Sequence, residues 1–130
     1  MAGDRKPVVA IVDDDARLLE SLADLLESTG HSARPFASAK ALLEDACFPE
    51  IDCLITDIGM PFIDGFELQR LARVARPMLP VILITGRPEI LNQQPLLTTE
   101  DGQQIFPKPF DSAALLVAVR QALRGAPDKQ

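Results

Sequence analysis

The chain has 130 residues, a length that fits one domain with a hydrophobic core of its own. Hydrophobic residues make up 47% and charged residues 25%, which is ordinary for a globular protein, and no apolar run approaches the roughly 18 residues that a membrane span needs. The net charge of −6 argues against direct nucleic-acid binding by this chain, because nucleic-acid phosphates are negative as well.

The first half of the chain alternates between strand and helix patterns. Apolar, mostly β-branched residues at 8–12 predict a buried strand, and leucines at helical spacing over 16–28 predict a helix that Gly30 ends. Residues 32–36 predict a weak edge strand. Residues 38–46 predict a short helix whose first residue, a serine, is the N-cap.

The second half repeats the alternation. Apolar runs at 51–56 and 81–85 predict two further buried strands, and a short strand is expected at 105–106. Helices are expected at 64–75 and 111–123, each with an aspartate at its N-cap position. About five strand–helix alternations predict an α/β fold, a doubly wound five-stranded parallel sheet with helices on both faces.

The segment between the last two strands departs from this pattern. A helix is expected there, and Pro88 favours a helix start, but Pro95 would break it after about two turns. We therefore expect a short or irregular fourth helix.

Domain organisation follows from the same pattern. We expect residues 1–130 to form a single domain with a core at about 7–124, and residues 125–130 to be a tail or the start of a linker. No signal-peptide pattern follows the first residues, so we expect a cytoplasmic protein. Cys47 and Cys53 lie in apolar surroundings and are expected to be buried, reduced thiols.

Polar side chains stand at, or just after, the ends of four of the five apolar runs. Asp13 and Asp14 follow the first run, Asp57 the third, Thr85 the fourth and Lys108 the fifth. These groups should meet at one edge, because ligands of open α/β sheets bind at the carboxyl ends of the strands. Two carboxylates about 4 Å apart repel by roughly 4 kcal/mol at an effective dielectric constant near 20, so the cluster needs a cation or raised pKa values. A hard, oxygen-seeking Mg²⁺ suits it, and such a site can accept a phosphoryl group on a carboxylate.

Six segments in chain order resemble the landmarks of response-regulator receiver domains. They are Val12-Asp13-Asp14-Asp15, Leu54-Ile55-Thr56-Asp57, Met60-Pro61, Asp64-Gly65, Ile84-Thr85-Gly86 and Lys108-Pro109-Phe110. Each motif alone is weak, but the six follow one another at family-like spacing over about residues 7–124. The resemblance implies a flavodoxin-like sheet with strand order 2-1-3-4-5.

The resemblance also implies a Mg²⁺-dependent phosphorylation site. Asp57 matches the phosphoacceptor, Thr85 the switch hydroxyl and Lys108 the phosphate-contacting lysine. The metal ligands that it implies are Asp13, Asp14, Asp57 and the backbone carbonyl of Gly59. In this family the peptide bond before the matching proline is often cis, which is expected for Lys108–Pro109.

The partners implied by the resemblance are those of two-component signalling. The phosphoryl donor would be a sensor histidine kinase or a phosphotransfer protein, and small phosphodonors are an alternative source. The output would be a further domain or a target protein, and a homodimer formed on phosphorylation is another partner that the family allows. The chain would not be an enzyme, but a phosphoacceptor that assists its own phosphorylation and dephosphorylation.

Some positions depart from the family pattern. Three residues before the lysine, where the family usually has Tyr or Phe, this chain has Ile105, and the aromatic residue is its neighbour Phe106. Neighbouring strand residues point to opposite faces, so Phe106 should face the interior and not replace the missing ring. We therefore expect an atypical switch. In the family, the positions of Gly59 and Arg87 affect the lifetime of the acyl phosphate. Gly59 offers no side chain to guide or block water, whereas Arg87 could shield the phosphoryl group or pair with it, so the sequence leaves this lifetime open.

Two alternative functions remain open at this stage. One is a receiver-like interaction module that works without phosphorylation, which Ile105 and the interrupted fourth helix favour. The other is a phosphohydrolase of the haloacid-dehalogenase type, which is disfavoured because Arg17 stands where that family has a hydroxyl residue and a second acidic motif is missing. His31 is the only histidine, which disfavours a zinc site and imidazole-based catalysis.

Overall fold

A five-stranded parallel sheet forms the centre of the computed structural model, which describes residues 6–86, 104–108 and 110–124. The strands are β1 (Val8–Val12), β2 (Ser32–Phe36), β3 (Cys53–Asp57), β4 (Val81–Thr85) and β5 (Gln104–Pro107). They pair in the order β2-β1-β3-β4-β5. The predicted doubly wound α/β fold with strand order 2-1-3-4-5 is therefore confirmed.

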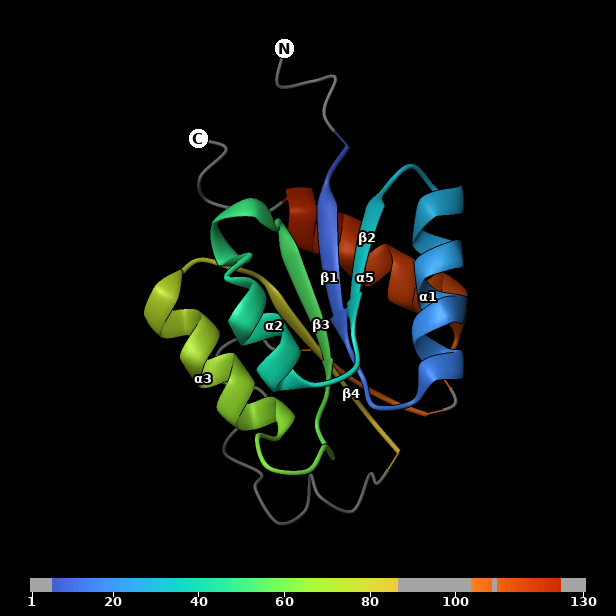
Figure 1. Cartoon of the computed structure of the whole chain (residues 1–130). Helices are drawn as coiled ribbons and strands as arrows, with labels where there is room; N and C mark the ends of the chain where they lie inside the picture. Colours follow the sequence, from blue (N-terminus) through green and yellow to red (C-terminus); the bar gives the residue numbers. More distant parts are fainter. Residues whose placement is uncertain (1–5, 87–103, 109, 125–130) are drawn as a thin grey trace.

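Helices cover both faces of the sheet, with α1 and α5 on one face and α2 and α3 on the other (Figure 1). Within the described ranges the helices are α1 (Ala16–Ser28), α2 (Ala39–Asp45), α3 (Gly65–Ala75), α5 (Ser112–Arg124) and a 3₁₀ turn, η2 (Phe48–Glu50). None of these helices is long and apolar enough to cross a membrane. The expected irregular fourth helix, Arg87, the Lys108–Pro109 peptide and the tail at 125–130 lie outside the described residues.

Side-chain caps begin the helices where the sequence predicts them. The side chains of Asp15, Ser38, Asp64 and Asp111 each accept a hydrogen bond from a backbone N–H in or next to the first helical turn. At the other end of α1 the chain turns at Gly30, whose φ of +92° lies in the region that glycine tolerates without strain. Local sequence signals therefore set these helix ends.

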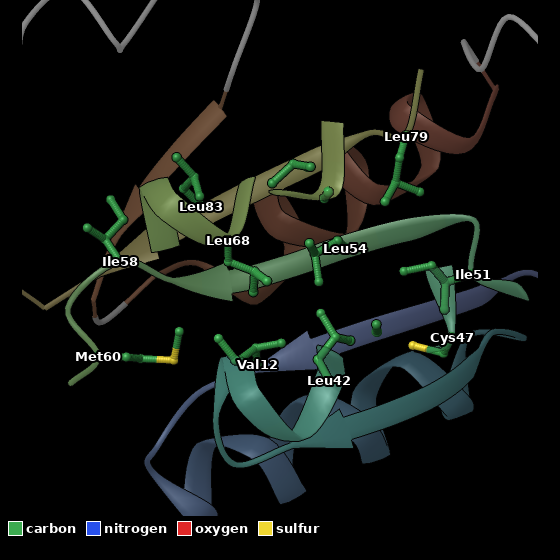
Figure 2. Close-up of a cluster of buried hydrophobic side chains, with 14 residues drawn as sticks. Val12, Leu42, Cys47, Ile51, Leu54, Ile58, Met60, Leu68, Leu79 and Leu83 are labelled. Carbon is green, nitrogen blue, oxygen red and sulfur yellow. The ribbon is translucent and has the colours of Figure 1, made fainter. Parts of the chain in front are cut away.

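Alternating strand residues build two hydrophobic cores, one on each face of the sheet. The α2–α3 core contains Ala10, Val12, Leu42, Cys47, Ile51, Leu54, Ile58, Met60, Leu68, Leu79 and Leu83, most of which Figure 2 labels. The α1–α5 core contains Val9, Ile11, Leu22, Leu26, Cys53, Ile55, Ile84, Leu115 and Val119. Because both faces are covered, the three central strands β1, β3 and β4 are apolar over most of their length, and their polar residues lie at the carboxyl ends, whereas the edge strand β2 carries Arg34.

Both cysteines are free and buried, as the sequence predicts. Cys47 lies in the α2–α3 core and Cys53 in the α1–α5 core, so the sheet separates the two thiols. Burial raises the pKa of both, that of Cys53 to about 12. These thiols therefore remain protonated and unreactive at neutral pH.

The third strand begins two residues later than predicted. Before β3 the chain forms the 3₁₀ turn η2, which the sequence analysis misses. The Arg76 guanidinium at the end of α3 donates hydrogen bonds to the carbonyl oxygens of Phe48 (2.7 Å) and Ile51 (2.6 Å). These contacts join the η2 segment to α3, a long-range interaction that no local pattern predicts.

The loop between β3 and α3 is held tightly against the end of β3. The Gly65 N–H donates to the Ile58 carbonyl at 2.9 Å. A Cβ atom on Gly65 would lie 2.5 Å from the backbone oxygen of Asp57 and 2.7 Å from Cα of Ile58. Only glycine permits this approach, and the approach fixes the backbone that carries the Asp57 side chain.

We predict that Gly65→Ala destabilises the fold by about 1–3 kcal/mol, the usual cost of an atom for which a packed site has no space. The matched control is Gly59→Ala in the same loop, where an added Cβ meets nothing within 4 Å, and its effect should stay within about 0.5 kcal/mol. Urea unfolding followed by circular dichroism measures both variants. Equal unfolding midpoints for Gly65→Ala and the unaltered chain would contradict the packing argument.

Candidate functional site

The polar residues predicted to meet at the sheet edge do meet there. Asp13 and Asp14 follow β1, Asp57 and Thr85 are the last residues of β3 and β4, and Lys108 follows β5. One carboxylate oxygen from each of the three aspartates lies within 4.8 Å of the other two. The parallel sheet brings these groups together because its strands all end at the same edge.

Asp13 is the most deeply buried of the three carboxylates, with an exposed fraction of 0%. Its Oδ1 accepts a hydrogen bond from the Asp15 N–H at 2.8 Å, and its Oδ2 lies 2.9 Å from Nζ of Lys108. Apart from this ion pair, Oδ2 has no hydrogen-bond partner within the part of the chain that the structure describes. A buried carboxylate oxygen with unused acceptor capacity is suited to bind a cation.

Asp57 and Asp14 differ from Asp13 in their surroundings. Asp57 is 5% exposed, its Oδ1 accepts a long hydrogen bond of 3.4 Å from the Gly59 N–H, and its Oδ2 lies 3.6 Å from Nζ of Lys108. Asp14 is exposed to solvent. The Asp57 carboxylate is therefore held weakly, while Asp14 borders the site from the solvent side.

Lys108 reaches both buried carboxylates because the backbone holds it at the sheet edge. Its N–H donates to the Thr85 carbonyl at 2.7 Å, which extends the β4–β5 ladder by one residue. Its aliphatic stem passes over Gly86, where a Cβ atom would lie 3.8 Å from Cδ. The ammonium is thereby directed toward both carboxylates, with Nζ at 2.9 Å from Oδ2 of Asp13 and at 3.6 Å from Oδ2 of Asp57.

Crowding of charge changes the proton affinities at this edge. Burial raises the pKa of Asp13 above its ordinary value, and the negative charge of Asp57 adds to the rise, while the Lys108 ammonium and the Asp15 N–H only partly offset it. For Lys108, burial lowers the pKa, but the contacts with Asp13 and Asp57 outweigh burial and raise it. The lysine therefore remains charged, and the carboxylates gain from a further cation.

The donor set fits Mg²⁺, which prefers hard oxygen ligands and commonly takes one or two carboxylates. Asp13 offers its underused Oδ2, Asp57 its weakly held carboxylate, and exposed Asp14 a third carboxylate at the solvent border. Gly59 has open space around the position of a side chain, so nothing on it crowds the site. These residues are the ones that the sequence analysis names as candidate metal ligands.

The two β5 residues at which the sequence departs from the family pattern point to opposite faces of the sheet, as predicted. Ile105 is half-buried and packs against the α2–α3 core, whereas Phe106 is half-buried and packs against the α1–α5 core. Phe106 therefore lies on the other face of the sheet and does not occupy the position of the missing ring. Ile105 pairs with Leu83, two residues before Thr85 on β4.

The sequence analysis assigns a structural role to Asp64-Gly65 but does not detect the close approach of Gly65 to Asp57. A glycine that directly follows a helix-capping aspartate, with no turn of its own to form, is the one local signal. The exposure of Phe62 in the same loop is likewise not predicted from the sequence, although this side chain is fully exposed. The apolar neighbours Ile58 and Met60 are buried, so nothing in the local sequence marks Phe62 as the apolar residue of this loop that is exposed.

Comparison with known proteins agrees with the observed fold. Residues 9–120 match the family model of the response regulator receiver domain, so the chain belongs to this family. It is 35% identical over 127 residues to the response regulator protein TodT of Pseudomonas putida, and 36% identical over 118 residues to the transcriptional regulatory protein FixJ of Azorhizobium caulinodans. The chain is thus the receiver domain of a two-component response regulator.

Solved structures of response regulators and receiver domains have the same fold as this chain. The response regulator StyR superposes with a TM-score of 0.83 at 32% identity, over 96% of this chain and 63% of that chain. A CheY-like receiver domain protein from Methanospirillum hungatei superposes with a TM-score of 0.81 at 26% identity, over 97% of this chain and all of that one.

The curated relatives are longer than this chain. The aligned region covers 98% of the chain but 56% of TodT, and 88% of the chain but 54% of FixJ. The chain therefore spans about half the length of these relatives, and their whole-protein activities concern more than the receiver domain.

We predict that Asp13→Asn stabilises the fold at neutral pH in the presence of a chelator, by about 1 kcal/mol or more, because it removes a buried charge that its neighbours only partly compensate. The raised pKa of Asp13 means that the charged form costs stability above that pKa, and that this cost vanishes as the pH falls through it. The gain should therefore shrink in acid. Urea unfolding over a pH series measures it.

The control for this prediction is Asp14→Asn, which neutralises the exposed neighbour and should change the unfolding free energy by less than about 0.5 kcal/mol. A loss of stability in Asp13→Asn at neutral pH would mean that the ion pair with Lys108 contributes more than burial of the charge costs.

Proposed function

We propose that Asp57 accepts a phosphoryl group in a Mg²⁺-dependent reaction, and that the receiver signals this state by a conformational change. The observation that carries the proposal is the Lys108 ammonium, held 2.9 Å from Asp13 and 3.6 Å from Asp57 at an edge with three carboxylates. This arrangement combines a nucleophile, a fixed positive charge and a set of metal ligands, which together are the requirements of phosphoryl transfer.

In the proposed reaction, a carboxylate oxygen of Asp57 attacks phosphorus and forms the P–O bond of an acyl phosphate. With a phosphohistidine donor, the P–N bond breaks, its electron pair stays on the imidazole nitrogen, and the imidazole takes up a proton from solvent. The Lys108 ammonium lies where charge on the phosphoryl oxygens would develop, and we assign the Thr85 hydroxyl to hydrogen-bond one of those oxygens. Bound Mg²⁺, held by Asp13, Asp14, Asp57 and the Gly59 carbonyl, would neutralise phosphoryl charge.

The donor in this proposal is a sensor histidine kinase or a phosphotransfer protein, and the output is a further domain or a target protein. The chain itself is not an enzyme with turnover, since it carries the phosphoryl group and assists its own phosphorylation and dephosphorylation. We place the protein in the cytoplasm, where ATP-dependent kinases supply the phosphoryl group.

The switch in this proposal is atypical because Ile105 stands where the family usually has an aromatic ring. An isoleucine packed against the α2–α3 core cannot rotate as a flat ring can, because branching at Cβ restricts its side-chain rotation. A shift of Thr85 would instead reach β5 through the backbone, by the hydrogen bond from Lys108 to Thr85 and the pairing of Leu83 with Ile105. The same departure favours a second candidate function, an interaction module that works without phosphorylation.

The first test is intact mass after incubation with a small phosphodonor such as acetyl phosphate, with and without Mg²⁺. We expect a gain of one phosphoryl group only with Mg²⁺, and no gain in Asp57→Asn, because the amide is a poor nucleophile. The matched control is Asp52→Asn, which lies at the opposite end of β3 and should be phosphorylated like the unaltered chain. No gain in the folded, unaltered chain would reject the phosphoacceptor proposal for these donors and favour the phosphorylation-independent module.

The switch is tested by methyl NMR of isoleucine-labelled protein before and after addition of Mg²⁺ and beryllofluoride, an analogue of the phosphoryl group. We expect large shifts for Ile84 beside Thr85, and for Ile105 only small shifts with an unchanged side-chain rotamer. Ile51, which precedes β3 at the opposite end of the sheet, serves as the reference for a distant methyl group. A rotamer change at Ile105 would contradict the backbone route, because it would show that the side chain switches after all.

A further inference from the structure

Phe62 projects fully into solvent from the loop between β3 and α3. Its exposed fraction is 105%, so the ring makes no contact that removes it from water. The other exposed large apolar residues within the described ranges are Val74, Met78 and Val117, and all three are less exposed. The ring of Phe62 therefore gives the fold no hydrophobic stabilisation.

The backbone at Phe62 is strained as well. Its φ is +70°, and the Ile63 N–H donates to the Pro61 carbonyl at 2.8 Å across it. A hydrogen bond across one residue with a positive φ defines the rare, strained form of the γ-turn. Left-handed conformations are uncommon for bulky residues, whereas glycine and asparagine adopt them more easily. A glycine or asparagine at this position would therefore lower the backbone strain.

The loop that carries this ring begins directly after the phosphoacceptor. Both ends of the loop meet at Ile58, the residue after Asp57, because the Met60 and Gly65 N–H groups both donate to its carbonyl. Phe62 is four residues from Ile58, so their Cα atoms are at most about 14 Å apart. A helix of ten residues is about 15 Å long. A helix that presents a phosphohistidine to Asp57 is therefore long enough to extend to Phe62.

We propose that Phe62 is an apolar anchor for the protein that donates the phosphoryl group, and determines which donor is used. This inference rests on the proposed function and adds the recognition of the donor. The occupant is an apolar pocket or groove on the phosphohistidine-bearing domain, since exposed aromatic residues that become buried are typical centres of binding energy. Asp14, Asp15 and Asp64 are exposed around the site, so the donor surface should carry basic residues around its apolar centre.

The experiment measures phosphotransfer from sensor kinases that have autophosphorylated with labelled ATP. The kinase transmitter domains of the source genome are screened, and the domain with the highest rate toward the unaltered chain is the probe. Phe62→Asn removes the ring and suits the positive φ, whereas Phe62→Tyr keeps an aromatic ring. Met78→Ala is the matched control, an exposed apolar side chain between α3 and β4, at the amino end of the sheet.

For Phe62→Asn we expect kcat/KM with the kinase to fall at least about tenfold, the effect of losing one anchor residue, mainly through a higher KM. Its rate with acetyl phosphate should stay within about twofold, because the ring touches no reacting group. Phe62→Tyr and Met78→Ala should transfer within about twofold of the unaltered chain. Phe62→Asn should also unfold at the same or a higher urea concentration, since its backbone strain is reduced.

Any of four results would overturn the inference. They are equal transfer to Phe62→Asn and the unaltered chain, an equal loss with acetyl phosphate, an equal loss in Met78→Ala, and phosphorylation by acetyl phosphate but by none of the kinases. Where transfer is equal, loss of self-association in Phe62→Asn would assign the ring to a second copy of the chain instead. If no donor phosphorylates the unaltered chain, the proposed function itself fails, so the two failures are distinguishable.

Discussion

The site depends on the position of one ammonium group between two buried carboxylates. The Nζ atom of Lys108 lies 2.9 Å from Asp13 and 3.6 Å from Asp57, and its charge offsets part of their repulsion. Its position is set by the backbone, because its N–H continues the β4–β5 ladder to the Thr85 carbonyl. The parallel sheet therefore determines which charges meet, because it aligns the strand ends that carry them.

Much of this arrangement is predictable from local sequence. Apolar strands that alternate with amphipathic helices allow few topologies, and the caps at Ser38 and Asp64 set helix starts to the residue. Given a parallel sheet, the residues after each strand must converge. The pattern of strands and helices alone therefore predicts that Asp57 and Lys108 meet, although the two residues are far apart in the sequence.

The remaining features depend on packing across the molecule, which no local pattern encodes. Adjacent aspartates after β1 look equivalent in the sequence, yet Asp13 is buried and Asp14 is exposed because the chain there turns away from the sheet. The same holds for the missed turn η2, which Arg76 holds from the end of α3, and for Gly65, whose need for space arises only where the loop contacts β3. Long-range contacts of this kind are visible only in the folded chain.

The residues proposed for phosphoryl transfer and the residue proposed for signalling lie in parts of the fold that tolerate substitution to different degrees. Asp13, Asp57 and Thr85 are buried at the ends of central strands, so a substitution there alters charge or packing in the interior. Ile105 is half-buried on an edge strand, where a change of side chain costs less. A receiver can therefore keep the groups for phosphoryl transfer while its transmission differs from that of its relatives. Because β5 is joined to the site by the backbone bond from Lys108 to Thr85, displacement of either residue by a phosphoryl group would still move the strand, even without a ring that rotates.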